Sequence, residues 1–394
     1  MLASTLVLAA LAGCSTLKPV ASTDAGNQAP FNGIRALAGD ENSPPVRIFM
    51  VHGISNHEPG WALEYLDPIA EQMSWKCETL VPPTPVELPK PGGTGALDTT
   101  ADYSAKLQVF TLSDSRRVRA IAYELTWSPL TINFKKTRLS PDDALQPKRT
   151  LVNGYLKEQV LNEDMSDVVL YLARYDNDIL RRSVRAALEH FYRKDYDPPA
   201  DKDRDENPVV FISESLGSMM LYGELQAEQK RLVNATALSA EDARDQAGFD
   251  EMVRHSRLFF MMANQLPLLD VNESTRYDHV PTAAEKGPLP QAMAFFGTLP
   301  PAVPGPGAET PVIDVVAFSD INDILSYPLD PDDVRGLPNV RLHLFAPVNT
   351  LMGFPFFERP DWAHTSYAGN PQVTAIVVDG YNPTGAALDG AKPK

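Results

Sequence analysis

The chain has 394 residues, of which 43% are hydrophobic and 22% charged, a composition typical of a globular protein with a sizeable core. Its 35 basic and 51 acidic residues give a formal net charge of -16. Because this charge repels a phosphate backbone, nucleic acid is not an expected partner.

The chain opens on a short apolar segment, MLASTLVLAALAGC, at residues 1–14. It is too short to span a bilayer and ends in small residues, as secretory signals do. Its last four letters, LAGC, resemble the bacterial lipobox. That resemblance implies a lipoprotein signal peptide and a lipid anchor on Cys14, with Ser15 directing the protein to the outer membrane facing the periplasm. An ordinary cleaved signal peptide and a short buried helix are the alternatives.

Two cysteines are present, so lipidation of Cys14 would leave Cys77 without a partner for an intramolecular disulfide. The sequence holds no Cys-x-x-Cys pair and no His-x-x-x-His run. These spacings are typical of metal sites, so neither a metal nor another cofactor is expected.

Residues 15–45 are rich in Ala, Asn, Gly, Ser and Pro without periodicity, which predicts a flexible tether. A single folded domain is expected over 46–394. Within it, 81–95 is dense in Pro and Gly and predicts a surface excursion. The Pro-dense segment at about 270–311 predicts an irregular insertion, with a cap as one possibility.

Strand-like and helical patterns alternate through the domain. Short apolar runs predict strands at 46–53, 105–112, 116–127, 209–213, 257–265, 312–318 and 340–348. Helical spacing is found at 60–73, 150–162, 167–192 with a break near Asp176, from about 216, at 241–255 and at 370–381. This alternation predicts an α/β fold with a mostly parallel central sheet and helices on both faces.

The stretch VVFISESLGSMMLYG, residues 209–223, combines a buried-type strand, a Ser-rich corner and a helix. A strained turn between strand and helix can expose a nucleophilic serine when small residues lie two before and two after it. Ser213 and Gly217 occupy those positions around Ser215. Ser215 is therefore the candidate nucleophile, and a plain turn or helix N-cap is the alternative.

At this point the chain resembles the α/β-hydrolase superfamily, in particular its lipases and esterases, over about 46–380. VHGISNHEPG follows the first strand as the His-Gly loop of that family does. The resemblance implies that the amides of Ile54 and Leu216 hold the oxyanion. His52 and Gly53 are expected to shape this loop rather than to react.

The family order places an acid after the penultimate strand and a histidine after the last one. VVAFSDINDILSY offers Asp323 as the acid, with Asp320 as the alternative. DWAHTSYAGNPQV offers His364 as the base that takes the proton of Ser215. The other histidines lie in helical, strand or irregular contexts and are expected to be structural.

These residues predict a serine hydrolase that cleaves carboxylic esters through an acyl-enzyme intermediate. The apolar segments at 292–299 and 351–362 suit a hydrophobic ester as partner, although they serve equally well as core packing. Alternatives are a peptidase or acyltransferase on the same fold, and a non-catalytic envelope lipoprotein.

Overall fold

The structure, a computed structural model, describes residues 18–19, 29–88, 104–139, 150–172, 177–202, 204, 206–233, 239–269, 294–297, 312–334, 337, 339–349 and 360–383. The predicted signal at 1–14, with Cys14, lies outside these residues, as do most of the segments at 270–311 and 351–362. No helix among the described residues is long and apolar enough to cross a membrane.

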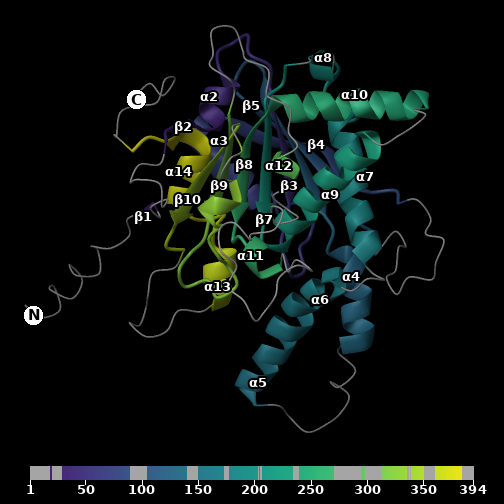
Figure 1. Ribbon diagram of the computed structural model, residues 1–394, viewed down its shortest axis with the longest axis vertical. Coiled ribbons are helices and arrows are strands. Elements are labelled where there is room, and N and C mark those ends of the chain that lie inside the picture. The colour runs from purple at the N-terminus through teal and green to yellow at the C-terminus, as the bar shows by residue number, and fades with distance from the viewer. Residues whose placement is uncertain are drawn as a thin grey trace, which may run out of the picture.

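A central sheet of nine strands organises the fold (Figure 1), in the order β1-β10-β9-β8-β7-β3-β6-β5-β4. The six strands from β10 to β6 are parallel, whereas β1, β5 and β4 pair antiparallel with their neighbours. A separate two-stranded sheet pairs β11 with β2. The strands are β1 (Lys18–Pro19), β2 (Phe31–Asn32), β3 (Val46–Val51), β4 (Lys76–Pro85), β5 (Lys106–Ser113), β6 (Val118–Thr126), β7 (Val209–Glu214), β8 (Ser256–Met262), β9 (Ile313–Phe318), β10 (Val340–Ala346) and β11 (Gly380–Tyr381). The predicted α/β class with a mostly parallel sheet is confirmed.

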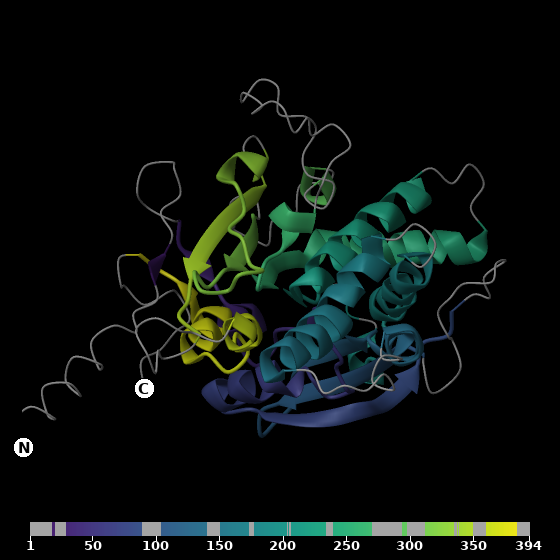
Figure 2. The ribbon, with the colours of Figure 1, turned by 90° about the horizontal axis from the view of Figure 1, so that it is seen from below.

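Helices cover both faces of this sheet. Figure 2 shows α14 beside α3, with α7 and α9 grouped apart from them. The α-helices are α2 (Ile34–Ala38), α3 (Leu63–Met73), α4 (Pro129–Phe134), α5 (Leu151–Tyr155), α6 (Ser166–Leu172), α7 (Asn177–Tyr192), α8 (Pro199–Lys202), α9 (Leu216–Val233), α10 (Ala240–His255), α11 (Leu266–Leu269), α12 (Ala294–Gly297), α13 (Pro360–Thr365) and α14 (Pro371–Asp379). Among the described residues, η2 (Lys135–Leu139) and η4 (Leu156–Met165) are π-helical and η5 (Pro331–Val334) is a 3₁₀ turn.

The strands read as continuous apolar runs because both of their faces are buried. In β3, Ile48 and Met50 pack into the core under α2, α3 and α14. Phe49 and Val51 point to the opposite side and pack with α7, α9 and α10. The period of two along the strand thus feeds two separate cores.

The topology also fixes where a site can form. From β3 the chain runs out to β4 at the sheet edge and returns through β5 to β6, whereas β7 pairs with the other side of β3. The carboxyl ends of β3 and β7 therefore lie side by side, and the chain leaves them toward opposite sides of the sheet. Ligands of open α/β sheets bind at such switch points.

Two sequence predictions about chain boundaries differ from the structure. The packed domain begins before Val46, because Phe31, Ile34 and Ala38 are buried in the core with α14. These few apolar residues lie in a polar background that hides them from a composition argument. The segment 81–85, predicted as part of a surface excursion, belongs to β4.

β4 tolerates its prolines because it is an edge strand. Pro82 and Pro83 lie where the pairing with β5 shifts register, between Val81 and Thr84. Proline lacks a backbone N–H, so it is accepted at an edge or a bulge and not in the centre of a sheet. The prolines that indicated a loop therefore lie in the strand at the edge of the sheet.

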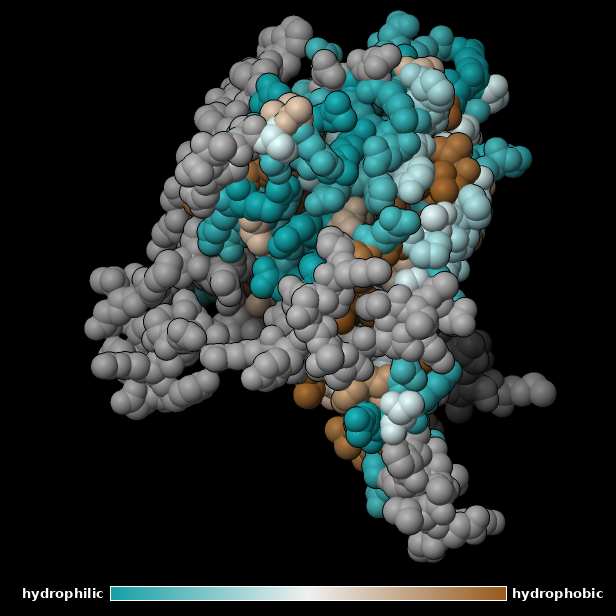
Figure 3. Space-filling model, turned by 90° about the vertical axis from the view of Figure 1, so that its right-hand side faces the viewer, coloured by the Kyte–Doolittle hydropathy of each residue, from teal (hydrophilic) through white to brown (hydrophobic). Residues whose placement is uncertain are grey.

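An arm formed by α5, η4 and α6, residues 151–172, projects from the body of the molecule (Figure 1). Figure 3 shows brown, hydrophobic surface where the arm projects below the body, and several large apolar side chains are exposed on it. They are Tyr155, Leu156, Leu161, Val169 and Leu172. The base of the arm, around α6, packs against the rest of the fold, as the burial of Val168, Leu170 and Tyr171 indicates. The end of η4 also contacts the body, because the side-chain amide of Asn162 donates to the carbonyl of Leu139 at 3.2 Å.

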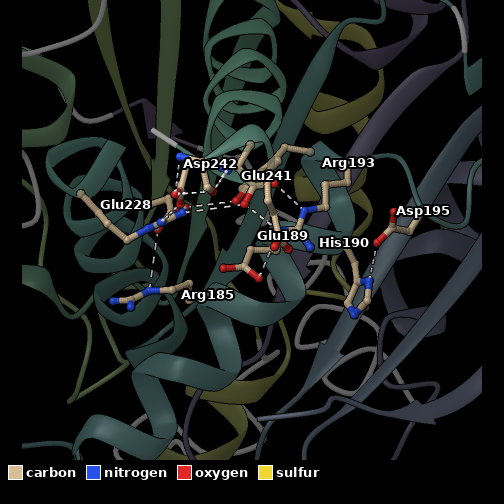
Figure 4. A network of polar contacts seen from close by, with 12 residues as sticks. Arg185, Glu189, His190, Arg193, Asp195, Glu228, Glu241 and Asp242 are labelled. Atoms are coloured by element: carbon tan, nitrogen blue, oxygen red, sulfur yellow. Dashed lines mark hydrogen bonds and ion pairs between the residues drawn. The ribbon is translucent and has the colours of Figure 1, made fainter. Parts of the chain in front are cut away.

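Helices α7, α9 and α10 are tied together by a network of ion pairs (Figure 4). Arg193, the residue after α7, makes a bidentate contact with Asp245 of α10, at 2.6 Å for both nitrogens. Arg231 of α9 bridges Glu228 at 2.6 Å and Asp242 at 3.2 Å. The network holds the C-terminal half of α9 in place. It lies at the opposite end of the helix from Leu216.

A buried ion pair lies at the start of β3. The Nε of Arg47 is 2.9 Å from Asp197, and another guanidinium nitrogen of Arg47 donates to the same carboxylate at 3.4 Å. Tyr123 donates to Asp197 at 2.6 Å, and the guanidinium lies 4.2 Å from the ring centroid of Phe191. Each charge in this cluster is compensated only while its partners are present.

Replacement of Arg47 by Met is therefore expected to lower the free energy of unfolding by about 3–5 kcal/mol, because it leaves the Asp197 carboxylate buried without its cation. Urea unfolding followed by circular dichroism measures this change. Lys76→Met, at the exposed pair with Glu78, is the control and should leave stability unchanged. Equal stability of both variants would contradict this account of the pair.

Candidate active site

Ser215 lies at the junction of β7 and α9 in a strained backbone conformation. Its φ is +52°, a region that non-glycine residues rarely adopt. Its amide donates to the carbonyl of Met262 at the end of β8, at 2.8 Å. The turn is thus held by the neighbouring strand, and the serine is presented at the carboxyl edge of the sheet.

Small residues on both sides of Ser215 let the strand and the helix approach each other. A Cβ on Gly217 would lie 2.3 Å from the carbonyl oxygen of His52 and 2.7 Å from that of Val51. Only glycine fits there, because both neighbours are backbone atoms. Ser213 instead links strand to helix: its Oγ lies 2.9 Å from Ser218 Oγ and 3.2 Å from Tyr222 Oη.

The structure brings three of the candidate residues together in one hydrogen-bonded chain. Nε2 of His364 lies 3.0 Å from Oγ of Ser215. Nδ1 of the same ring lies 2.9 Å from both carboxylate oxygens of Asp323. His364 is 149 positions from Ser215 and 41 positions from Asp323 in the sequence. All three side chains are buried.

Asp323, and not Asp320, is the carboxylate that contacts the histidine. Asp320 instead accepts from the amides of Asn322 at 2.9 Å and Asn349 at 2.6 Å, so it caps its own turn and tethers the loop after β10. The two aspartates therefore have different tasks, which their spacing of three residues alone could not separate.

Tyr367 connects these two aspartates and was not predicted from the sequence. Its hydroxyl accepts from the amide of Asp320 at 2.7 Å and donates to Asp323 at 3.1 Å. Asp323 also accepts from the amide of Leu325 at 3.0 Å. Together these contacts orient the carboxylate toward His364. Tyr367 follows His364 by three residues, and no known motif marks it.

The electrostatic surroundings favour the protonated form of His364. Burial by itself lowers the pKa of His364, but the hydrogen bond and charge of Asp323, with the carboxylates of Glu214 and Asp164, outweigh burial and raise it. Glu214 precedes the serine directly, and burial raises its own pKa to about 7. The ring is therefore well suited to accept a proton and to hold the positive charge.

The loop after β3 lies against the serine. A Cβ on Gly53 would lie 2.6 Å from Cβ of Ser215. His52 is fixed as the Nδ1–H tautomer: Nδ1 donates to the carbonyl of Gly53 at 2.8 Å, and Nε2 accepts from the amide of Trp127 at 3.0 Å. Burial lowers the pKa of His52 well below its usual value, so the ring is neutral.

This arrangement fixes the direction of the Ile54 amide. The carbonyl of Gly53 and the N–H of Ile54 belong to one trans peptide and point in opposite directions. The ring of His52 holds that carbonyl on one side, so the N–H faces the other. The amide of Leu216 is the first of α9, where N–H groups have no intrahelical acceptor. The predicted oxyanion donors are thus backbone groups of the residue that follows Ser215 and of the residue that follows Gly53, which itself packs against the serine.

The remaining histidines with described contacts are engaged elsewhere. His57 stacks near His52, with ring centroids 4.2 Å apart, and its Nε2 donates to the carbonyl of Ile54 at 3.1 Å. His343 contacts Asp314 at 2.7 Å near the start of β9, at the opposite edge of the sheet. His190 contacts Asp195 at 2.7 Å. None of these contacts involves Ser215.

The described residues include no group of three or more His, Cys, Asp and Glu that could hold a metal ion. Comparisons with models of protein families, with curated proteins and with solved structures find no match to this chain. The chemistry of the site therefore has to be argued from its own geometry. A serine, an imidazole and a carboxylate in this order can deprotonate the hydroxyl and stabilise the resulting imidazolium.

The close approach at Gly217 yields a stability prediction. Gly217→Ala should lower the free energy of unfolding by about 1–3 kcal/mol or more, because its Cβ meets backbone atoms that cannot move aside. Gly223→Ala, in the same helix, is the matched control, since its nearest neighbour would be the Tyr171 hydroxyl at 3.6 Å.

The control should be neutral or stabilising by about 0.5–1 kcal/mol, the usual gain from removing a helical glycine. Urea unfolding of both variants provides the comparison. A Gly217→Ala protein as stable as Gly223→Ala would show that helix and strand are not in the close contact described.

Proposed function

We propose that the protein is a serine hydrolase of the α/β-hydrolase fold that cleaves carboxylic esters. The observation that carries the proposal is the continuous hydrogen-bonded chain from Ser215 Oγ through His364 to Asp323. Further support comes from the positive φ of Ser215 and from the topology, because the serine, the acid and the histidine follow β7, β9 and β10, whose carboxyl ends lie at one edge of the parallel sheet.

In the proposed reaction, His364 Nε2 takes the proton of Ser215 Oγ as the oxygen attacks the ester carbonyl. The amides of Ile54 and Leu216 receive the negative charge that develops on the carbonyl oxygen. His364 then gives its proton to the alcohol that leaves, and an acyl-enzyme remains on Ser215. Water, deprotonated by the same ring, releases the acid and regenerates the hydroxyl.

Apolar surface beside this site supports hydrophobic esters as the substrate class. Ile321 is 87% exposed and Ile324 is 64% exposed, and both flank Asp323 on its loop. Isolated exposed apolar residues are common, but these adjoin a site and have further apolar side chains on the nearby arm. The segment at 292–299 supplies less support, because Phe295 and Phe296 are buried against Phe259 in the core.

A location in the bacterial envelope remains part of the proposal. It rests on the apolar segment at 1–14 and on Cys14 as the lipidated residue, which lie outside the described residues. Detergent-phase partitioning of the full chain, lost in Cys14→Ala, would support that anchor. A non-catalytic envelope protein, a peptidase and an acyltransferase are the competing functions, and substrate profiling separates them.

Hydrolysis of short- and long-chain p-nitrophenyl esters tests the activity. Ser215→Ala and His364→Ala should each lose about a thousandfold or more in kcat, because either change removes the nucleophile or its base. Asp323→Asn should cause a loss of similar size, and Asp320→Asn a much smaller one. Equal losses for Asp320→Asn and Asp323→Asn would contradict the assigned acid, and activity that survives Ser215→Ala would contradict the nucleophile.

The raised pKa of His364 predicts a pH dependence. Only the neutral ring can accept the serine proton, so kcat/KM should fall as pH drops through the pKa of His364, which lies above its usual value. The Glu214 carboxylate contributes to this rise, and its removal in Glu214→Gln should therefore shift the acidic limb of the profile to lower pH.

The pH dependence of kcat/KM with a p-nitrophenyl ester measures this shift. Glu78→Gln, an exposed carboxylate on β4, is the control and should leave the profile in place. An acidic limb that stays put in Glu214→Gln, or that moves to higher pH, would show that Glu214 does not act on His364.

A further inference from the structure

A buried ion pair lies behind the loop that carries Ile54. Nζ of Lys135, at the start of η2, is 2.9 Å from the carboxylate of Asp167 on α6. The side chains are 3% and 0% exposed, respectively. Neither residue belongs to the hydrogen-bonded chain of Ser215, and no pattern in the sequence marks either of them.

Both partners of this pair bind the loop after β3. The amide of Ser55 donates to Asp167 Oδ2 at 2.9 Å. Nζ of Lys135 donates to the side-chain oxygen of Asn56 at 3.1 Å. Ser55 has a φ of +83°, so its backbone is strained and must be held by contacts of this kind.

The contact with Asp167 constrains one particular peptide plane. The carbonyl of Ile54 accepts from His57 Nε2 at 3.1 Å, and the N–H of the same peptide donates to Asp167. That plane is therefore held at both ends. The preceding peptide, whose N–H is the Ile54 donor, is held through its carbonyl by His52. Two consecutive planes thus have fixed orientations, and together they determine where the Ile54 N–H points.

We infer that the Lys135–Asp167 pair is a positioning pair that orients the oxyanion-binding amide of Ile54. The inference rests on the proposed hydrolase function and adds to it two residues from the excursion between β6 and β7. Asp167 holds the peptide directly, and Lys135 stabilises the buried carboxylate and fixes the neighbouring side chain. Neither residue contacts the substrate in this scheme.

Stability alone is a weak reason for burying such a pair. Desolvation of two charges offsets most of their attraction, and apolar residues of similar volume are often as stable. A hydrogen bond from an amide to a carboxylate is, however, stronger than one to a neutral acceptor. A charged acceptor therefore suits a strained peptide whose direction matters for transition-state binding.

Two double variants separate the acceptor from the ion pair. Lys135→Met with Asp167→Leu removes the charges and the acceptor, whereas Lys135→Met with Asp167→Asn removes the charges and keeps a carbonyl oxygen for the Ser55 amide. In p-nitrophenyl ester hydrolysis the Leu variant should lose about tenfold to a hundredfold in kcat, with little change in KM. The Asn variant should lose less.

The affinity for a trifluoromethyl ketone of matching acyl chain is the decisive second readout. Its serine adduct carries an oxyanion, so its Ki should rise by the same factor as kcat falls. Arg193→Met with Asp245→Leu is the control, because it removes an ion pair of the network around α7, α9 and α10 (Figure 4), 25% and 4% exposed, that does not contact the loop after β3. It should lower stability in urea and leave kcat and Ki unchanged.

Each outcome decides whether the pair positions the Ile54 amide or contributes to stability alone. Wild-type kcat and Ki in the folded Leu variant would overturn the inference, as would losses that match those of the Arg193/Asp245 control. If the Leu variant does not fold, the Asn variant decides, and an unchanged Ki there overturns the inference. A wild-type protein that neither hydrolyses esters nor binds the ketone would instead refute the proposed function, and the positioning role with it.

Discussion

The strained turn at Ser215 is the constraint on which the arrangement of the site depends. A non-glycine residue at positive φ costs roughly 1–3 kcal/mol and persists only where its surroundings enforce it. Here the enforcement comes from three sides: the bond from the Ser215 amide to Met262, the contact of Gly217 with the carbonyl of His52, and the burial of Leu216 in the core. The pairing of β7 with β3 and β8 places their ends side by side, and the loop at Gly53 lies against the serine.

Three histidine rings near this turn differ in whether their surroundings favour the positively charged form. His364 faces the carboxylates of Asp323, Glu214 and Asp164, which together raise its pKa. Burial instead lowers the pKa of His52 well below its usual value and that of the adjacent His57 to about 4. Positive charge is thus favoured at one imidazole and disfavoured at two others that lie close by. His364 can therefore exchange a proton with Ser215, whereas His52 and His57 form hydrogen bonds with backbone groups.

Much of the fold could be predicted because its strands are buried on both faces and its helices are amphipathic. The strand runs at 46–53 and 209–213 and the helix from Leu216 appear as β3, β7 and α9. The start of the domain could not be predicted, since Phe31 and Ile34 are isolated apolar residues in a polar segment. The edge strand β4 was hidden by Pro82 and Pro83, which indicate a loop unless the pairing partner is known.

The same limit applies to the site. Ser215 and His364 stood out because their residue types and order carry a chemical pattern, and the contact between them follows from the sheet topology. Tyr367 and Asp167 carry no pattern: each matters through polar contacts with residues distant in sequence. The choice between Asp320 and Asp323 likewise depended on which carboxylate the turn directs toward the ring. Such contacts are set by tertiary packing, and a single sequence does not encode them in any local signal.

The central claim is that Ser215 is an activated nucleophile. Reaction of the protein with a fluorophosphonate, followed by peptide mapping with mass spectrometry, tests it most directly. The account predicts one adduct per chain, on the peptide that contains Ser215, and strongly slowed labelling in His364→Ala. An unlabelled Ser215 in folded protein, under conditions that fully label a control serine hydrolase, would contradict it.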